Sequence, residues 1–134
     1  MTLTLGAVGR DWIAGEQSGE GPSAPSCIVP VAAIAACFPD ASQTLASTES
    51  DEATGSAAGS LASRLGLGFV LRDLCRRRAA LRITTPRDVL HGTIDRVARD
   101  HVDLAEHEPG TLRRDHAVRA MRILPLSEVL LVRF

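Results

Sequence analysis

Apolar and polar residues alternate in short runs over most of this chain, with the period of two that half-buried β-strands require. Turns rich in Gly, Pro, Asp and Ser separate the runs. The first part of the chain predicts strands at Met1–Val8, Trp12–Glu16 and Cys27–Val29, and then a helical turn or a last strand at Val31–Cys37. The same pattern returns in the second half and predicts further strands there. These are Ala80–Thr84, Val89–Val97, His101–Ala105, Val118–Leu124 and Val129–Phe134.

One helix is predicted, over Ser60–Arg78. Ser60 can cap its start, and Arg76, Arg77 and Arg78 fall in its last turn, where cations suit the helix dipole. At about 100° per residue its apolar residues fall on two opposite sides, which indicates burial on both. We therefore expect one central helix between two groups of strands. The helix residues expected in the core are Leu61, Leu65, Phe69, Val70 and Leu74.

Residues 1–37 and 92–134 read as two copies of one pattern. In each copy, Val-small-Arg-Asp is followed by a ring side chain and a β-branched residue. Further on, an apolar pair precedes Pro, another apolar residue, two variable residues and a β-branched one. Such a repeat is one supersecondary unit used twice. The equivalent pairs that it predicts are Val8 and Val97, Ile13 and Val102, Pro30 and Pro125, and Ile34 and Val129.

The first copy has no counterpart of the helix or of the strand that follows it. An open sheet edge has to be paired or covered, so we expect the backbone of Thr2–Val8 to pair outside residues 9–40. Its partner would be a strand within residues 80–97, or the same strand of a second chain in a symmetric dimer. A natural chain that starts upstream of Met1 is a further alternative.

The composition divides the chain into three parts. Residues 1–40 form the first, incomplete unit, and residues 60–134 form the helix with the second, five-stranded unit. Between them, residues 41–59 hold mostly Ser, Thr, Ala and Gly, with three acidic residues and a single Leu. This segment has too little apolar surface to offset the entropy of ordering it. We expect a flexible linker there.

Charge and cysteine content narrow the class of protein. All 15 basic residues are Arg, and the net charge is −6 over residues 1–60 and +5 over residues 61–134. This asymmetry is typical of a basic binding face or of two halves that attract each other. Cys27, Cys37 and Cys75 lie in apolar runs without metal spacing, which predicts reduced, buried thiols in a cytoplasmic protein. We expect no signal peptide and no contact with a membrane, because no apolar stretch approaches the roughly 18 residues of a membrane span.

A helix followed by five short antiparallel strands, with a Gly in a long second strand and a Pro corner before the last, resembles the Sm-like or SH3-like small β-barrel. The residues that carry the resemblance are Gly92, Ile94, Val97, Asp100, Val102, Leu104, Ile123, Leu124, Pro125, Leu126 and Val129. It implies a mainly β fold of two tandem barrel units, the first incomplete. Residues 61–134 also resemble uncharacterised two-unit proteins of high-GC actinobacteria, through Asp95-Arg96-Val97, Asp103–His107 and Pro109-Gly110.

The Sm resemblance does not extend to the RNA-binding pocket. Sm proteins that hold RNA carry a Met-Asn-like pair in the first motif and an Arg-Gly-Asn-like loop in the second. The corresponding residues here are Asp100–Asp103 and Met121–Leu124, without that Gly or Asn. Arginines of the second unit could still track a phosphate backbone, although no exposed aromatic set accompanies them for base stacking. These candidates are Arg76, Arg77, Arg78, Arg113, Arg114, Arg119 and Arg122.

Histidines and acids of the second unit are the other chemical candidates. His101, Asp103 and His107 could suggest a metal site, as could His91 and His116 with the acids near them, but strand spacing alone does not make metal ligands converge. We expect an exposed polar face instead, with no metal, cofactor or catalytic residue. The sequence therefore favours a non-enzymatic module for protein–protein interaction or self-association through barrel edges. The alternative is an Sm-like RNA-binding regulator.

Overall fold

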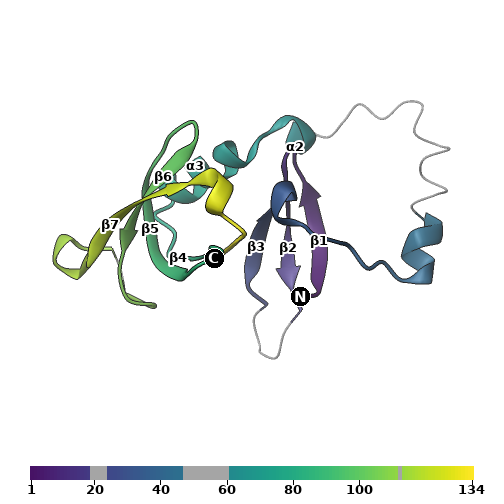
Figure 1. Ribbon diagram of the computed structural model, residues 1–134, viewed down its shortest axis with the longest axis horizontal. Coiled ribbons are helices and arrows are strands. Elements are labelled where there is room, and N and C mark those ends of the chain that lie inside the picture. Colours follow the sequence, from purple (N-terminus) through teal and green to yellow (C-terminus); the bar gives the residue numbers. More distant parts are fainter. Residues whose placement is uncertain (19–23, 47–60, 112) are drawn as a thin grey trace.

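A computed structural model describes residues 1–18, 24–46, 61–111 and 113–134 of the chain. Its strands join into one antiparallel sheet in the order β1-β2-β3-β8-β4-β5-β6-β7 (Figure 1). The strands are β1 Leu3–Val8, β2 Trp12–Gln17, β3 Ser26–Pro30, β4 Leu81–Thr84, β5 Val89–Val97, β6 His101–Glu106, β7 Ala120–Pro125 and β8 Leu131–Arg133. The predicted mainly β class is confirmed, and each strand lies where the alternation of apolar and polar residues placed it.

The helical part differs from the single helix that the sequence predicts. Two helices, α2 (Leu61–Arg64) and α3 (Leu67–Arg76), replace it, and the chain leaves the helix at Leu65 and Gly66. Ser60, the expected cap, lies outside the described residues. Short 3-10 turns complete the secondary structure; they are η1 Val31–Ala33, η2 Asp115–Ala117 and η3 Leu126–Glu128. None of the described helices is long and apolar enough to cross a membrane.

The turn between β1 and β2 explains the break in the helix. The carbonyl of Leu65 accepts hydrogen bonds from the Arg10 N–H (3.0 Å) and from the Trp12 ring Nε1 (2.9 Å), so it is not available to continue a helix. The Leu67 N–H then donates to Asp11 Oδ1 at 2.7 Å, which caps the start of α3. These partners lie more than fifty residues away in the sequence, so periodicity alone could not reveal them.

Strand registers in the two halves agree with the predicted equivalences. Val8 pairs with Ile13 across the first hairpin, and Val97 pairs with Val102 across the hairpin of β5 and β6. Both hairpins contain a shift in register three residues before their ends, between Leu5 and Ala7 and between Ile94 and Arg96. In both halves the third strand ends on a proline, and a 3-10 turn follows it. Pro30 has φ −59° and ψ 136°, and Pro125 has φ −58° and ψ 139°.

Strand β8 joins the two copies. On one side it pairs with β4, with Val132 opposite Ile83; on the other it pairs with β3, with Val132 opposite Ile28. In Figure 1 the C-terminus accordingly lies between the group β1–β3 and the group β4–β7. The last strand of the second copy therefore also covers the outer edge of the first copy.

The expectation for the edge strand β1 is wrong. Among the described residues β1 pairs only with β2, which lies within residues 9–40. The reason is that β1 is short: it is equivalent only to Gly92–Val97 of the longer β5, and β4 pairs with the part of β5 that precedes Thr93. In β5, the residues from Thr93 onward have no pairing with β4 either, and α3 packs there instead. Helix α2 takes the corresponding place beside β1.

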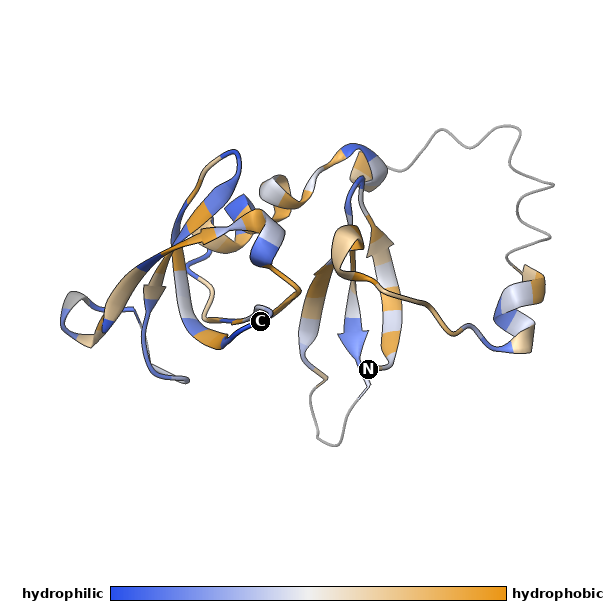
Figure 2. Ribbon diagram, in the orientation of Figure 1, coloured by the Kyte–Doolittle hydropathy of each residue, from blue (hydrophilic) through white to orange (hydrophobic). Residues whose placement is uncertain are grey.

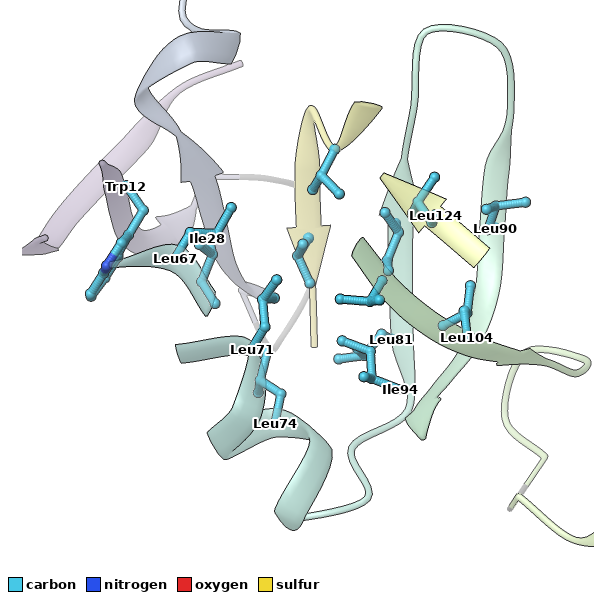
Figure 3. Close-up of a cluster of buried hydrophobic side chains, with 14 residues drawn as sticks. Trp12, Ile28, Leu67, Leu71, Leu74, Leu81, Leu90, Ile94, Leu104 and Leu124 are labelled. Carbon is cyan, nitrogen blue, oxygen red and sulfur yellow. The ribbon is translucent and has the colours of Figure 1, made fainter. Parts of the chain in front are cut away.

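One large apolar core runs through both copies (Figure 3). Helix α3 contributes Leu67, Leu71 and Leu74, which lie at helical spacing on a single face. The prediction of a helix buried on two sides is therefore wrong: Leu61 is 75% exposed and Phe69 46% exposed, while Leu65 and Val70 are half-buried. The core residues are Trp12, Ile28, Leu67, Leu71, Leu74, Leu81, Ile83, Leu90, Ile94, Val102, Leu104, Leu124, Val129 and Val132.

The expected linker is helical at its start. Residues 41–46 form a short exposed helix, and residues 47–59 lie outside the described part of the chain. Asp40 caps this helix: its Oδ1 accepts from the Gln43 N–H at 2.8 Å, while its own N–H donates to Gln43 Oε1 at 2.9 Å. This reciprocal pair is a capping box. The hydrogen bonds that the Asp40 carboxylate accepts, first from the Ser42 hydroxyl and then from the Gln43 N–H, hold the pKa of Asp40 below its ordinary value.

Candidate interaction surface

Strand β7 forms one edge of the sheet, and β6 is its partner among the described residues. Leu124 of β7 points into the core, but Met121 is 56% exposed and Ile123 is 73% exposed. Large apolar side chains on an open sheet edge invite pairing with another strand. The edge of β7 is therefore the first candidate site.

The free backbone groups of β7 can be assigned from its ladder. The Leu126 N–H donates to the Asp100 carbonyl at 2.8 Å, so residue 126 faces the β6 side. Alternate residues of an antiparallel strand bond to the same neighbour. The N–H and carbonyl groups of Met121 and Ile123 consequently face away from β6, beside the exposed apolar side chains.

Strand β3 shows what this edge looks like when it is filled. Ser26 and Ile28 are the equivalents of Met121 and Ile123, and the Phe134 N–H donates to the Ser26 carbonyl at 3.0 Å. Ile28 lies opposite Val132 of β8 and is fully buried. The chain thus holds one strand edge twice, once covered by β8 and once uncovered.

The candidate arginines of the second unit are mostly bound to acids. Arg113 donates to both carboxylate oxygens of Asp95, at 2.9 and 2.7 Å, and Arg78 donates to the same carboxylate at 2.7 Å. The pKa of Asp95 is held below its ordinary value, mainly by the hydrogen bond from Arg113 and in addition by the charge of Arg78. The structure therefore brings Arg78 and Arg113 together, but both guanidinium groups bind the carboxylate of Asp95.

The other candidate arginines are separate from that pair. Arg77 pairs with Asp73, Arg119 with Glu108, and Arg122 with Glu106 at 2.8 Å. The hydrogen bond from Glu106 raises the pKa of Arg122 above its ordinary value. Arg76 and Arg114 are exposed and form no ion pair with any residue that the structure describes.

A cleft of about 580 Å³ gathers arginines that the sequence did not single out. Arg10 and Arg99, which are equivalent in the two copies, line it together with Arg72. The half-exposed Phe69 and the carboxylate of Asp11 border the same cleft. The repeat was the available signal, since it places Arg10 and Arg99 in matching turns. Neither Arg72 nor Arg99 forms an ion pair with the described part of the chain.

The candidate histidines are separated along β6. His101, at its start, lies 2.7 Å from Asp100 Oδ1, and its Nε2 is 3.7 Å from Asp103 Oδ1. His107 follows the end of the strand, about 20 Å further on, and is buried against Thr93 Oγ1 (2.9 Å) and the Glu108 carbonyl (3.1 Å). Within the described residues, no group of three possible metal ligands comes together.

The three cysteines differ in exposure, so the prediction that all are buried is wrong for one of them. Cys27 is buried in β3, and burial raises the pKa of its thiol. Cys75 is half-buried, and Cys37 is exposed in the segment that follows η1. In Figure 2 this segment, which leads from η1 toward the helix at 41–46, is coloured as hydrophobic.

Comparison of the chain with family models, with curated proteins and with solved structures finds no match.

Proposed function

We propose that this protein is a non-enzymatic assembly module that binds a protein partner through the outer edge of β7. The carrying observation is the contrast between Ile28, buried under β8, and Ile123, its exposed equivalent. A partner supplies an extended segment that pairs with the free backbone groups of Met121 and Ile123. Main-chain hydrogen bonds then provide affinity, and an apolar residue over Ile123 provides selectivity.

We also propose that the second copy is a small barrel of the Sm-like or SH3-like kind and that the first copy is an incomplete one. The strand order β8-β4-β5-β6-β7 and the 3-10 turn between β7 and β8 support this for the second copy. The first copy supplies three strands and the matching 3-10 turn. The free thiols of Cys27, Cys37 and Cys75 favour a reducing, cytoplasmic location.

A peptide with the sequence of Val129–Phe134 tests the proposed function, because the same residues already cover the equivalent edge of β3. With a lysine tail to keep it in solution, the peptide is titrated onto the intact protein and followed by amide hydrogen exchange. We expect new protection at Met121 and Ile123. Ile123→Lys, which places a charge on the edge, is expected to weaken binding at least tenfold.

Val8→Lys is the matched control. Val8 is also a half-exposed apolar residue on an edge strand, but it lies on β1 at the other end of the sheet. The control protein is expected to bind the peptide as the wild type does. Equal binding by the wild type and by Ile123→Lys, or protection confined to β1, would refute the assignment of β7.

The alternative function, RNA binding by an Sm-like regulator, draws its support from the cleft rather than from the arginines singled out in the sequence. Arg10, Arg72 and Arg99 line one cleft beside Phe69, which combines cations for phosphate with a ring for stacking. Retention on immobilised single-stranded RNA that falls steeply with salt, and that is lost in Arg72→Gln with Arg99→Gln, would favour this alternative. We place it second because several arginines outside the cleft, among them Arg77, Arg78 and Arg122, are paired with acids.

A further inference from the structure

Strand β8 has a counterpart in the first copy, in the residues that follow η1. Ile34 ends η1 with φ −86° and ψ 110°, and Val129 ends η3 with φ −80° and ψ 116°. Counting onward from these two residues, Ala36, Cys37 and Phe38 take the places of Leu131, Val132 and Arg133. The chain direction is thus set in the same way for both segments.

The two segments have opposite surroundings. In the second copy, Val132 is fully buried between Ile28 of β3 and Ile83 of β4. In the first copy, residues 35–38 belong to no strand and are exposed, and Phe38 is 94% exposed. Three consecutive apolar residues therefore remain in solvent where their equivalents form a buried strand. Burial of these side chains, of the Phe38 ring above all, would favour association.

We infer that residues Ile34–Phe38 of one copy of this chain occupy the β7 edge of a second copy. The inference rests on the proposed function, whose partner it names. The pairing of β3 with β8 within one chain is the template for this contact. Strand β7 is the equivalent of β3, and residues Ile34–Phe38 are the equivalent of β8, but neither of these two has a strand partner at the corresponding edge. The register of the joint places Cys37 opposite Ile123 and Phe38 opposite Arg122.

One copy cannot fill its own edge. In Figure 1 the segment runs from η1 toward the helix at 41–46, while β7 lies at the opposite end of the molecule. Donor and acceptor are different surfaces, so each copy gives one segment and receives one, head to tail. Contacts of this kind add copies in a row, which closes into a ring where the rotation between copies allows it.

The joint between copies is weaker than its internal template. Pro39 stands where Phe134 donates its N–H to the Ser26 carbonyl, and proline has no N–H to give. The segment also lacks a neighbour equivalent to β4 on its other side. Association is therefore reversible and depends on protein concentration.

Cys37 provides a direct test. Directly opposed residues of an antiparallel pair have Cα atoms about 5.5 Å apart, within the range that a disulfide spans. Ile123→Cys, made with Cys75→Ala to remove the half-buried thiol, is oxidised mildly at high protein concentration. We expect a ladder of reducible dimers, trimers and larger species. Ile123→Cys with Cys37→Ser is expected to give no ladder.

Val8→Cys with Cys75→Ala is the matched control, because it places a thiol on the other edge and keeps Cys37. It is expected to form at least tenfold less multimer. Equal ladders from both edges, or a ladder that survives Cys37→Ser, would overturn the inference. Absence of any ladder, with wild-type protein that sediments as a monomer at all concentrations, would also overturn it. Peptide binding at β7 would then still decide the proposed function separately.

Discussion

Ile28 and Ile123 hold the same position in two copies of one three-stranded unit, but Ile28 is completely buried and Ile123 is 73% exposed. The strand that separates these two situations is β8, which lies against β3 and leaves β7 bare. Sequence equivalence therefore does not imply equal contribution to stability. Residues in equivalent positions can contribute differently to the free energy of unfolding, because their burial differs.

Truncation of the two isoleucines tests this difference. Ile28→Ala removes buried atoms next to Val132 and Leu67 and is expected to lower the free energy of unfolding by about 2–5 kcal/mol. Ile123→Ala in dilute protein is expected to change it by less than about 0.5 kcal/mol. Urea denaturation at low protein concentration measures both. Similar losses for the two variants would mean that β7 is covered even in dilute solution.

The cap that Asp11 provides for α3 gives a second prediction. Asp11→Ala leaves the Leu67 N–H without its acceptor, and we expect a loss of about 0.5–2 kcal/mol in unfolding free energy. Asp11→Asn keeps a side-chain oxygen and is expected to retain most of the stability. The control is Asp100→Ala, the equivalent position in the second copy, where no helix start needs a cap. A larger loss in the control would contradict this role of Asp11.

Gly9 and Trp12 form a matched pair. A Cβ at residue 9 would overlap the Trp12 ring, so Gly9→Ala forces the ring out of its place and away from the Leu65 carbonyl. We expect a loss of about 1–3 kcal/mol and a red shift in the fluorescence of this single tryptophan. The second copy has Ala98 with His101 at these positions. Adding Trp12→His to Gly9→Ala is therefore expected to restore part of the stability.

Gly68→Ala is the control for Gly9→Ala. At this position in α3 a Cβ would approach only the end of the Arg72 side chain. Alanine also favours helix over glycine, by up to about 1 kcal/mol. The variant is expected to be as stable as the wild type or slightly more stable, with unchanged fluorescence. A red shift here would show that the ring responds to changes in α3 rather than to residue 9.

Asp95 predicts a specific pH dependence. Its hydrogen bonds from Arg113 and Arg78 lower the pKa of the folded state below the value of about 3.9 in the unfolded chain. The folded protein thus binds this proton more weakly than the unfolded chain. The stability that Asp95 contributes is complete above the unfolded-state pKa and is lost as the pH falls through the folded-state pKa.

Asp95→Asn should therefore cost about 1–3 kcal/mol near pH 7, and the difference from the wild type should shrink below about pH 4. Urea denaturation over that pH range measures the effect. Asp88→Asn, at an exposed turn position, is the control and should show little change. A difference that stays constant into acid would assign the loss to packing instead of charge.

The sequence predicts the strands and the repeat because both depend on local alternation and turn chemistry. Val8, Val97, Pro30 and Pro125 could be matched from the printed residues alone. Contacts between residues that are distant in the sequence cannot be predicted from such local patterns. The Leu65 carbonyl breaks the helix only because Trp12 and Arg10 bind it, and nothing near Leu65 in the sequence announces them.

The candidate site shows the same division. The exposed edge of β7 follows from the order of the strands, and that order depends on which strands β8 pairs with. Alternation predicts that β8 is a strand, but it does not show that its neighbours are β3 and β4. Most of the arginines chosen from charge alone have acids as partners, such as Asp95 for Arg113. Arg10 and Arg99 line one cleft together with Arg72. The repeat places Arg10 and Arg99 in matching turns, but it does not show that the two turns border the same cleft.

The position of β8 in the sequence determines how long the edge of β3 stays uncovered during synthesis of the chain. A ribosome makes β3 early and β8 last among the strands, about a hundred residues later. At roughly 5–20 residues per second, the edge that β8 will cover waits on the order of 5–20 s with Ile28 unprotected. The amino-terminal unit therefore cannot complete its folding while it is being made.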